Sequence, residues 1–299
     1  MNAVHWAERL PPETLVCECM TIDHREDAPP FVRADAPLLH LQRAATHLPS
    51  RCIGPFDLTL RTGERVAVLG PSGAGKSTLV KLMAGERKAH EGAVMLGAAD
   101  VACVHARDLA HRRAVLPQQH AVAFGMPVAL VVSLGRLARE PDPEQAHITA
   151  AALEAAHASH LHGRRFDTLS GGEQARVQLA RVMAQLWDAR EGLLLVDEPL
   201  AALDPGLQFE LLDALIGYAE QRAHALVAVL HDVNQALSHF DRLWLVSDGK
   251  LVADIASDRA AVPHLAALFG IGFDCVARPG GRFAALACAR AAPLREAAA

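Results

Sequence analysis

A glycine-rich run with one lysine and one serine lies early in the chain, Gly70-Pro71-Ser72-Gly73-Ala74-Gly75-Lys76-Ser77. Its G-x-x-x-x-G-K-[ST] spacing is typical of a phosphate-binding loop. The glycines allow a compact turn whose backbone N–H groups point at phosphate oxygens, and the helix that follows adds its positive end. Lys76 is expected to bind the β- and γ-phosphates and Ser77 to ligate Mg²⁺, with Thr78 completing the binding run.

Two carboxylates follow an apolar run further along the chain, Leu193-Leu194-Leu195-Val196-Asp197-Glu198. Asp197 can reach Mg²⁺, usually through water, and Glu198 can polarise an attacking water molecule. Two surface acids after a core strand are the alternative. The phosphate-binding loop upstream favours the catalytic interpretation.

A third apolar run, from Leu226 to Leu230, is followed directly by His231. A histidine at the end of a strand is usually structural when it stands alone. Here it is the third reactive residue to end such a run, after Gly70 and Asp197. Buried runs of this kind indicate parallel strands of a doubly wound α/β sheet, whose ligands collect beyond the carboxyl ends of the strands.

Composition sets the class of protein. The chain has 299 residues, of which 51% are hydrophobic, so it can bury a large core. Its longest stretch without an ionisable side chain, 121–135, is shorter than the roughly 20 apolar residues that cross a bilayer.

The N-terminus lacks the features of a signal peptide, and six scattered cysteines favour reduced thiols, so we expect a cytoplasmic location. A net charge of -5 argues against a broad nucleic-acid surface.

The chain divides into an extension, a main domain and a tail. Residues 1–37, with paired prolines and an acidic excess, are expected to be poorly ordered. Residues 38–260 form the main domain, which begins with two strand-like runs that Pro49 and Gly54 interrupt. Residues 243–246 and 250–255 flank an Asp-Gly turn and predict a hairpin. Residues 261–299 are expected to form a C-terminal tail.

Residues 120–168 predict a helical insert in the α/β domain. Asp142 can cap a helix whose first residue is Pro143, and the alanine-rich stretch continues to His160. The spacing of His157 and His160 would place both on one helical face. No carboxylate or cysteine completes a ligand set there, so we favour a solvated helix end over a metal site.

A second motif, Leu169-Ser170-Gly171-Gly172-Glu173-Gln174, follows this insert and occurs once. Its serine and glycines open a predicted helix that continues to Trp187 with a buried apolar stripe, and the helix N-terminus is a second anion site. With the phosphate loop, the two acids and His231, the chain resembles the ATPase subunit of an ABC transporter over residues 38–290. The resemblance implies a P-loop ATPase core with an antiparallel β subdomain and an inserted α-helical subdomain.

The resemblance also assigns roles within the site. His231 matches the switch histidine that contacts the γ-phosphate. Gln118 matches the glutamine that touches Mg²⁺ and the attacking water. Asp204 matches a polar contact across a dimer. His47 stands where relatives carry an aromatic residue that stacks on adenine, although a surface histidine is the alternative.

The resemblance further implies a head-to-tail dimer, because Ser170, Gly171 and Gly172 are expected to lie far from Lys76 of the same chain. Each ATP, with its Mg²⁺, would then lie between the loop of one chain and these three residues of a second copy. One chain would therefore carry half of each site.

The finer resemblance is to haem-import ATPases, and it rests mainly on residues 112–118, 132–136 and 176–187. Importers of ferric siderophores or cobalamin are the alternative, and an export ATPase or a soluble ABC protein is less favoured. The resemblance implies membrane permeases as direct partners and a periplasmic substrate-binding protein as an indirect one. It places the chain at the cytoplasmic face of the inner membrane, with no nucleic acid as partner.

Overall fold

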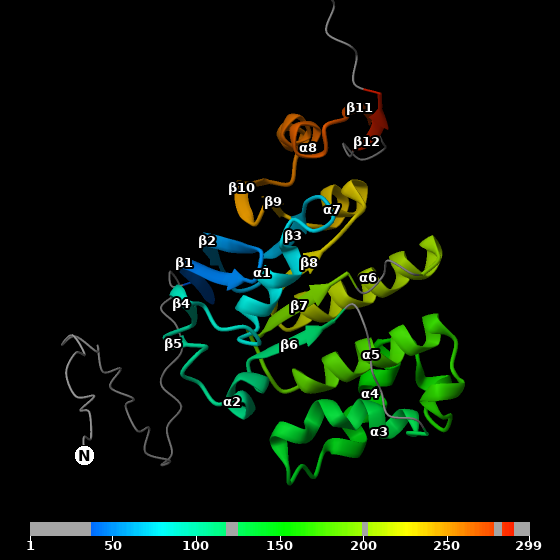
Figure 1. Cartoon of the computed structure of the whole chain (residues 1–299). Helices are drawn as coiled ribbons and strands as arrows, with labels where there is room; N and C mark the ends of the chain where they lie inside the picture. The colour runs from blue at the N-terminus through cyan, green and yellow to red at the C-terminus, as the bar shows by residue number, and fades with distance from the viewer. Residues whose placement is uncertain (1–36, 118–124, 199–202, 278–282, 290–299) are drawn as a thin grey trace, which may run out of the picture. The chain divides into compact units, whose positions relative to one another are not determined.

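The computed structural model describes residues 37–117, 125–198, 203–277 and 283–289, so nearly all of the expected N-terminal extension lies outside the described residues. The largest sheet (Figure 1) contains β3 (Arg65–Leu69), β6 (Arg113–Leu116), β7 (Leu193–Asp197), β8 (Ala225–Val229), β9 (Arg242–Ser247) and β10 (Lys250–Ala256). The strand order is β10-β9-β3-β8-β7-β6, and only β10 is antiparallel to its neighbour. This order confirms the predicted doubly wound parallel sheet.

The two faces of this sheet belong to different hydrophobic cores. Because side chains alternate along a strand, Val66 and Val68 face one core while Ala67 and Leu69 face the other. The same alternation holds along β7 and β8. Both faces are covered, which is why these strands are continuous apolar runs in the sequence.

One face packs against α1 (Lys76–Met83) and a second sheet, in which β1 (Leu39–Leu48), β2 (Arg51–Leu60), β4 (Glu91–Leu96) and β5 (Ala99–Asp100) pair in the order β2-β1-β4-β5. These pairs are antiparallel, as the predicted β subdomain requires. We expected Gly54 to interrupt the strand. Instead, it lies within β2. Its φ is 107°, and a Cβ atom there would lie 2.5 Å from the carbonyl oxygen of Ala44, so only glycine fits.

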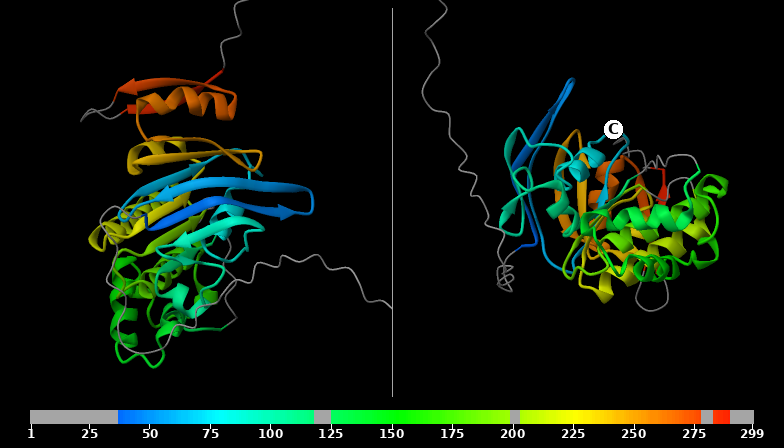
Figure 2. Two further views of the ribbon diagram at one scale, coloured as in Figure 1. Left: turned by 90° about the vertical axis from the view of Figure 1, so that its left-hand side faces the viewer. Right: turned by 90° about the horizontal axis from the view of Figure 1, so that it is seen from below.

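The other face packs against α5 (Gly171–Gln185) and α6 (Pro205–Gln221), and α3 (Val128–Ser133) and α4 (Gln145–Ala155) extend this layer. Figure 2 shows these helices, in green, and the antiparallel sheet, in blue, on different sides of the six-stranded sheet. The helical insert is therefore present. The described residues also form a short helix α2 (Ala106–Ala110) and four segments of 3₁₀ helix, at 134–139, 159–161, 166–168 and 259–261.

The limits that we expected for α4 are wrong. The helix begins at Gln145, not at Pro143, and Asp142 accepts a hydrogen bond from the backbone N–H of Glu144 at 3.2 Å. It ends at Ala155, not at His160, because His157 has a φ of 53°, which no α-helix accommodates. His157 and His160 therefore do not share a helical face.

The last part of the main domain contains α7 (Val233–His239) and the expected hairpin of β9 and β10. Asp248 and Gly249 join these strands, and both have positive φ, as a type I′ turn requires. Beyond the hairpin, α8 (Val262–Phe269) precedes an antiparallel pair of strands, β11 (Gly272–Ala277) and β12 (Phe283–Cys288). Residues that we treated only as a tail thus form a helix and a small sheet. No helix in the described ranges is long and apolar enough to span a membrane.

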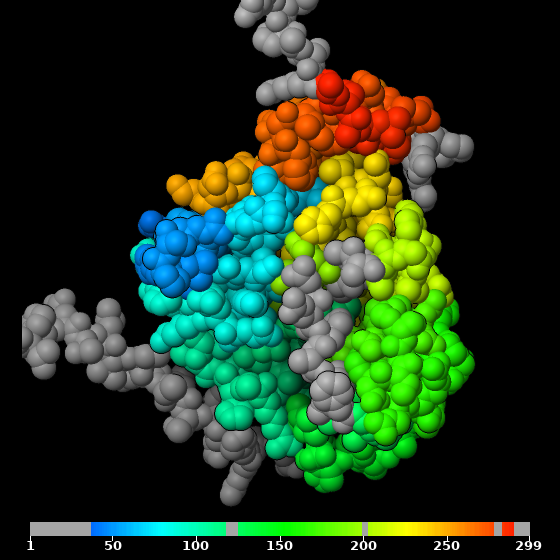
Figure 3. Space-filling view, turned by 45° about the vertical axis from the view of Figure 1, so that its right-hand side comes forward, coloured from blue at the N-terminus to red at the C-terminus, as the bar shows by residue number. Residues whose placement is uncertain are grey.

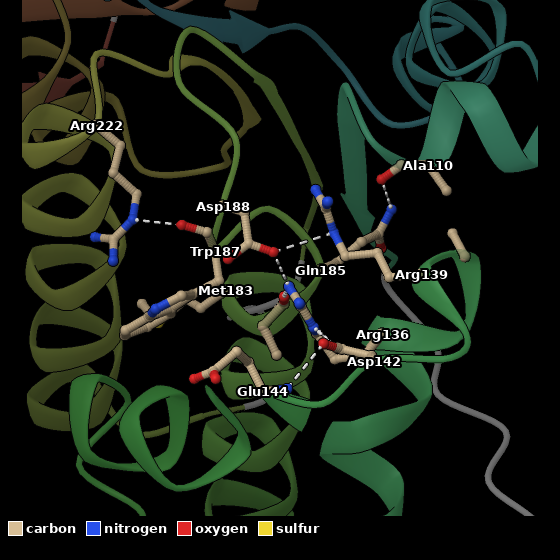
Figure 4. Close-up of polar contacts among 12 residues, drawn as sticks. Ala110, Arg136, Arg139, Asp142, Glu144, Met183, Gln185, Trp187, Asp188 and Arg222 are labelled. Carbon is tan, nitrogen blue, oxygen red and sulfur yellow. Dashed lines mark hydrogen bonds and ion pairs between the residues drawn. The ribbon is translucent and has the colours of Figure 1, made fainter. Parts of the chain in front are cut away.

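A buried arginine ties the helical insert to α5 (Figure 4). Arg136 is 2% exposed, and its guanidinium lies 2.7 Å from a carboxylate oxygen of Asp142 and 2.7 Å from one of Asp188. It also donates to the carbonyl oxygen of Ala184 at 3.2 Å. The next residue of α5, Gln185, donates to the carbonyl oxygens of Ala110 and Arg113. The end of α5 is therefore the anchor of the insert.

Replacing Arg136 by methionine is expected to destabilise the protein by about 3 kcal/mol or more. The reason is that Asp142 has a side chain only 6% exposed, and its hydrogen bond to Arg136 holds the pKa of that carboxyl below its usual range. Urea unfolding at neutral pH measures the loss. Arg139→Met is the matched control: Arg139 shares Asp188 at 3.3 Å but is 25% exposed, so we expect a loss below about 1 kcal/mol. Equal losses in the two variants would contradict this interpretation.

A second prediction concerns pH and His224, which is 1% exposed. Its Nδ1 accepts the backbone N–H of Gly192 at 2.9 Å, and burial lowers the pKa of His224 to about 4. Since its unfolded pKa is near 6.5, the unfolded chain takes up a proton first as the pH falls, so stability present above pH 6.5 is lost toward pH 4. The loss from His224 is expected to be about 2 to 3 kcal/mol by pH 4.5. Urea unfolding of wild type and His224→Gln at pH 7.5 and 4.5 measures it, and an equal pH dependence in both would refute the prediction.

Candidate nucleotide-binding and hydrolysis site

Three parallel strands bring the candidate residues to one edge of the large sheet. Strand β8 lies between β3 and β7, so the segment that ends in His231 lies between the phosphate loop and Asp197. On the face that Figure 3 shows, α1, in cyan, lies next to the segment around α7, in yellow. The expected meeting of the strand ends is confirmed.

The phosphate loop is a tight turn whose lysine is buried. A Cβ atom on Gly70 would lie 2.1 Å from the carbonyl oxygen of Val246, and Gly75 has a φ of 104°, so both positions require glycine. Lys76 is 4% exposed, and its Nζ donates to the carbonyl oxygens of Gly70 at 2.8 Å and Pro71 at 3.1 Å. The N-terminus of α1 has no side-chain cap, so its N–H groups are suited to bind phosphate oxygens.

Asp197 and Ser77 form a pair of hard oxygen ligands. The Ser77 hydroxyl donates to Oδ1 of Asp197 at 2.9 Å, and Asp197 is 7% exposed. Burial raises the pKa of the Asp197 carboxyl, and the neighbouring Glu198 raises it further. A cation at this position would offset the cost of a buried carboxylate. A hydroxyl and a carboxylate are the donors that Mg²⁺ prefers, so the residues present fit this ion.

The carboxylate of Glu198 contacts two other side chains of the site. Its Oε2 lies 2.8 Å from Nε2 of His231, and its Oε1 lies 3.6 Å from Nζ of Lys76. The Glu198 side chain is 12% exposed, and the residue has a φ of 50°, in the left-handed region that non-glycine residues rarely adopt. Such conformations cluster at functional sites. A carboxylate held in this way can accept a proton from water.

The second motif opens α5 as expected. Ser170 caps this helix: its backbone N–H donates to Oε2 of Glu173 at 2.8 Å, and its hydroxyl accepts the backbone N–H of Glu173. Gly171 is the first residue of the helix, and a Cβ atom on Gly172 would lie 2.4 Å from Leu207 of α6. The six apolar positions predicted for the helix are all buried, namely Val177, Leu179, Ala180, Val182, Met183 and Leu186. Within this chain, the Ser170 side chain bonds to its own helix.

Two of the predicted residues have local contacts that explain their positions. Asp204 caps α6, where its Oδ1 accepts the backbone N–H of Leu207 at 3.0 Å. His47, at the end of β1, has a side chain that is 53% exposed, and its Nε2 lies 3.4 Å from a carboxylate oxygen of Glu91. The dimer contact of Asp204 and the adenine stacking of His47 stay predictions. Gln118 lies outside the described residues.

Sequence reasoning missed two neighbours of these residues. Arg51 donates to the carbonyl oxygen of Gly73, which places a guanidinium beside the phosphate loop. The ring of His90 packs edge-on against His47, with ring centres 5.4 Å apart. Both contacts join segments that are distant in the sequence, and no spacing in the sequence indicates them.

Comparisons with known proteins agree with this geometry. The family model described as ABC transporter matches residues 53–201. The "Hemin import ATP-binding protein HmuV" of Bordetella parapertussis is 42% identical over 230 residues, which cover 75% of this chain and 88% of the relative. The protein of the same name from Pseudomonas aeruginosa is 47% identical over 197 residues, which cover 65% and 77%.

Solved structures share the fold. An inward-facing metal-chelate type ABC transporter superimposes with a TM-score of 0.71 at 24% identity, covering 85% of this chain and 97% of the other. The ADP conformation of an ATP-binding cassette of an ABC transporter superimposes with a TM-score of 0.67 at 20% identity, covering 79% and 98%. At these identities the likeness shows the fold alone, and it confirms the predicted fold class.

Proposed function

Because this chain belongs to the ABC transporter family of ATP-binding subunits, we propose that it hydrolyses ATP to drive uptake of haem through partner permeases. One observation carries the hydrolytic part of the proposal: Glu198 contacts both His231 and Lys76 at the carboxyl edge of the sheet. This arrangement supports the proposal that Glu198 is the base, because its carboxylate lies between the Lys76 ammonium and His231.

In the proposed mechanism, Lys76 exchanges its bonds to loop carbonyls for bonds to the β- and γ-phosphates of ATP. Ser77 and Asp197 would hold Mg²⁺, which supplies positive charge that neutralises the phosphates. Glu198 accepts the proton of the attacking water, and His231 orients Glu198 through its 2.8 Å contact and binds the γ-phosphate. Gln118 would add a further contact to the water and the ion.

The second half of the site would come from another copy of the chain. The N-terminus of α5, with Ser170, Gly171 and Gly172, suits an anion. Within one chain the Ser170 side chain bonds to Glu173. A head-to-tail dimer would place this end of the helix on the ATP held by the partner's loop, with Asp204 near the contact between chains. His47 would stack on the adenine.

The cargo is proposed from the relatives. Those in Bordetella, Pseudomonas and Methylobacillus that are 40–47% identical are named for hemin import. An ATPase of this kind would sit at the cytoplasmic face of the membrane, bound to permeases that receive haem from a periplasmic binding protein. The alternative cargoes are ferric siderophores and cobalamin.

The test is reconstitution in lipid vesicles with a candidate permease and its periplasmic binding protein. Haem-loaded binding protein is expected to stimulate ATP hydrolysis, whereas ferric siderophore and cobalamin are expected to leave the basal rate unchanged. Stimulation by another cargo would reassign the substrate, and stimulation by none would contradict an importer. A complex carrying Glu198→Gln is the control, because stimulated phosphate release must disappear there if it comes from this site.

A further inference from the structure

His231 lies between a buried strand and a short helix. Strand β8 ends at Val229 and α7 begins at Val233, with Asp232 as its cap: Oδ1 of Asp232 accepts the backbone N–H of Asn234 at 2.7 Å. The strand is fixed, because every residue of β8 is buried between two neighbouring strands. The position of His231 therefore depends on how α7, which has seven residues, is held.

The C-terminal sheet holds the first turn of this helix. Nδ2 of Asn234 donates to the carbonyl oxygen of Ala285 at 3.1 Å, and its Oδ1 accepts the backbone N–H of Ala285 at 2.8 Å. One side-chain amide thus pairs with β12 in the way that a residue of a neighbouring strand would. Ala285 is only 2% exposed, so water cannot easily replace these bonds.

The next residue of α7 is held from another side. Gln235 is 5% exposed, and its amide donates to Oε1 of Gln208 in α6 at 3.2 Å. Gln208 in turn donates to the carbonyl oxygen of Leu203 at 2.9 Å. The first turn of α7 is therefore fixed between α6 and the C-terminal sheet, three residues after His231.

We propose that Asn234 is a positioning residue for His231, and that the sheet of β11 and β12 is thereby part of the hydrolytic apparatus. The inference rests on the proposed ATPase function. The 2.8 Å contact between His231 and Glu198 requires accurate placement of both, and small displacements of catalytic groups are costly. Loss of both bonds to Ala285 frees the turn that carries His231, while the phosphate loop on β3 and α1 is untouched.

The test is a double-mutant cycle on ATP hydrolysis by the full chain. Asn234→Ala is expected to lower kcat by about three- to tenfold with little change in the KM for ATP. In a His231→Ala background the same change is expected to alter kcat by less than about twofold, because the group that Asn234 positions is gone. If Asn234→Ala is too unstable to assay, Asn234→Asp, which keeps the acceptor for the Ala285 N–H, replaces it in the cycle.

Ser257→Ala is the matched control. The Ser257 hydroxyl donates to the carbonyl oxygen of Ala236 at 3.1 Å, so this variant also removes a bond to α7, but not one that leads to the C-terminal sheet. We expect wild-type kcat for it. An equal loss of kcat from Asn234→Ala with and without His231, or no loss at all, would overturn the inference. A wild-type chain without ATPase activity would instead overturn the proposed function.

Discussion

Replacing Glu198 by glutamine is expected to lower kcat for ATP hydrolysis by about 10²- to 10⁴-fold. The amide has nearly the shape of the carboxylate, but it cannot accept a proton from water. Lys76, Ser77 and Asp197 keep their places, so the variant should still bind ATP. Phosphate release under saturating ATP and binding of a fluorescent ATP analogue measure the two effects separately.

The chain contains a closely matched control at the other end of the same strand. Glu191 precedes β7 as Glu198 follows it, and it too has a left-handed backbone, with a φ of 58°. Its side chain is exposed and lies at the opposite edge of the sheet. Glu191→Gln is expected to keep wild-type kcat. If Glu198→Gln hydrolysed ATP at the wild-type rate, another residue would have to be the base.

The second large effect is expected from Lys76→Ala, which should weaken ATP binding by about 10²-fold or more. Lys76 is 4% exposed, and its ammonium contacts two loop carbonyls and Glu198, so it is already fixed where phosphates would bind. Charge-assisted bonds of this kind are stronger than neutral ones. Titration with an ATP analogue gives the affinity.

The Lys81→Ala variant tests whether ATP affinity depends on the specific contacts of Lys76 or only on the positive charge of α1. Lys81 lies on α1 and is exposed, and its charge partly offsets the rise that burial causes in the pKa of the Asp197 carboxyl. We expect its loss to change ATP affinity by about twofold or less. A Lys81→Ala variant as weak as Lys76→Ala would mean that charge alone, and not the loop geometry, determines binding.

The sequence predicted which side chains meet at the carboxyl edge of the sheet, because buried parallel strands are easily recognised in a sequence. Each strand is apolar on both faces, and the first polar residue after it lies at the carboxyl edge of the sheet. Asp197, Glu198 and His231 were located in this way, and their mutual distances follow from the strand order. Local motifs were equally informative, since Ser170 caps α5 and Gly171 and Gly172 are its first residues.

Other features could not be predicted, since they depend on contacts between distant segments. The end of α4 is set by the left-handed backbone at His157, which the alanine-rich sequence does not indicate. The strands of the C-terminal sheet are six residues long, and the side-chain amide of a single asparagine, Asn234, bonds β12 to α7. Nothing in the sequence indicates that Arg136 is buried, yet it joins the segment before α4 to the end of α5 and the residues that follow it.

The central claim is that each hydrolytic site combines Lys76 of one chain with Ser170 of a second copy. Mixing differently tagged chains tests it most directly. A dimer of one Lys76→Ala chain and one Ser170→Arg chain keeps one intact site, whereas a dimer of wild type and a chain carrying both changes keeps none.

We predict that the first mixed dimer, purified by both tags, hydrolyses ATP well above either parent homodimer, and that the second does not exceed the parents. The reverse order, with activity confined to the mixture of wild type and doubly substituted chain, would mean that each site is built within one chain and would contradict the account.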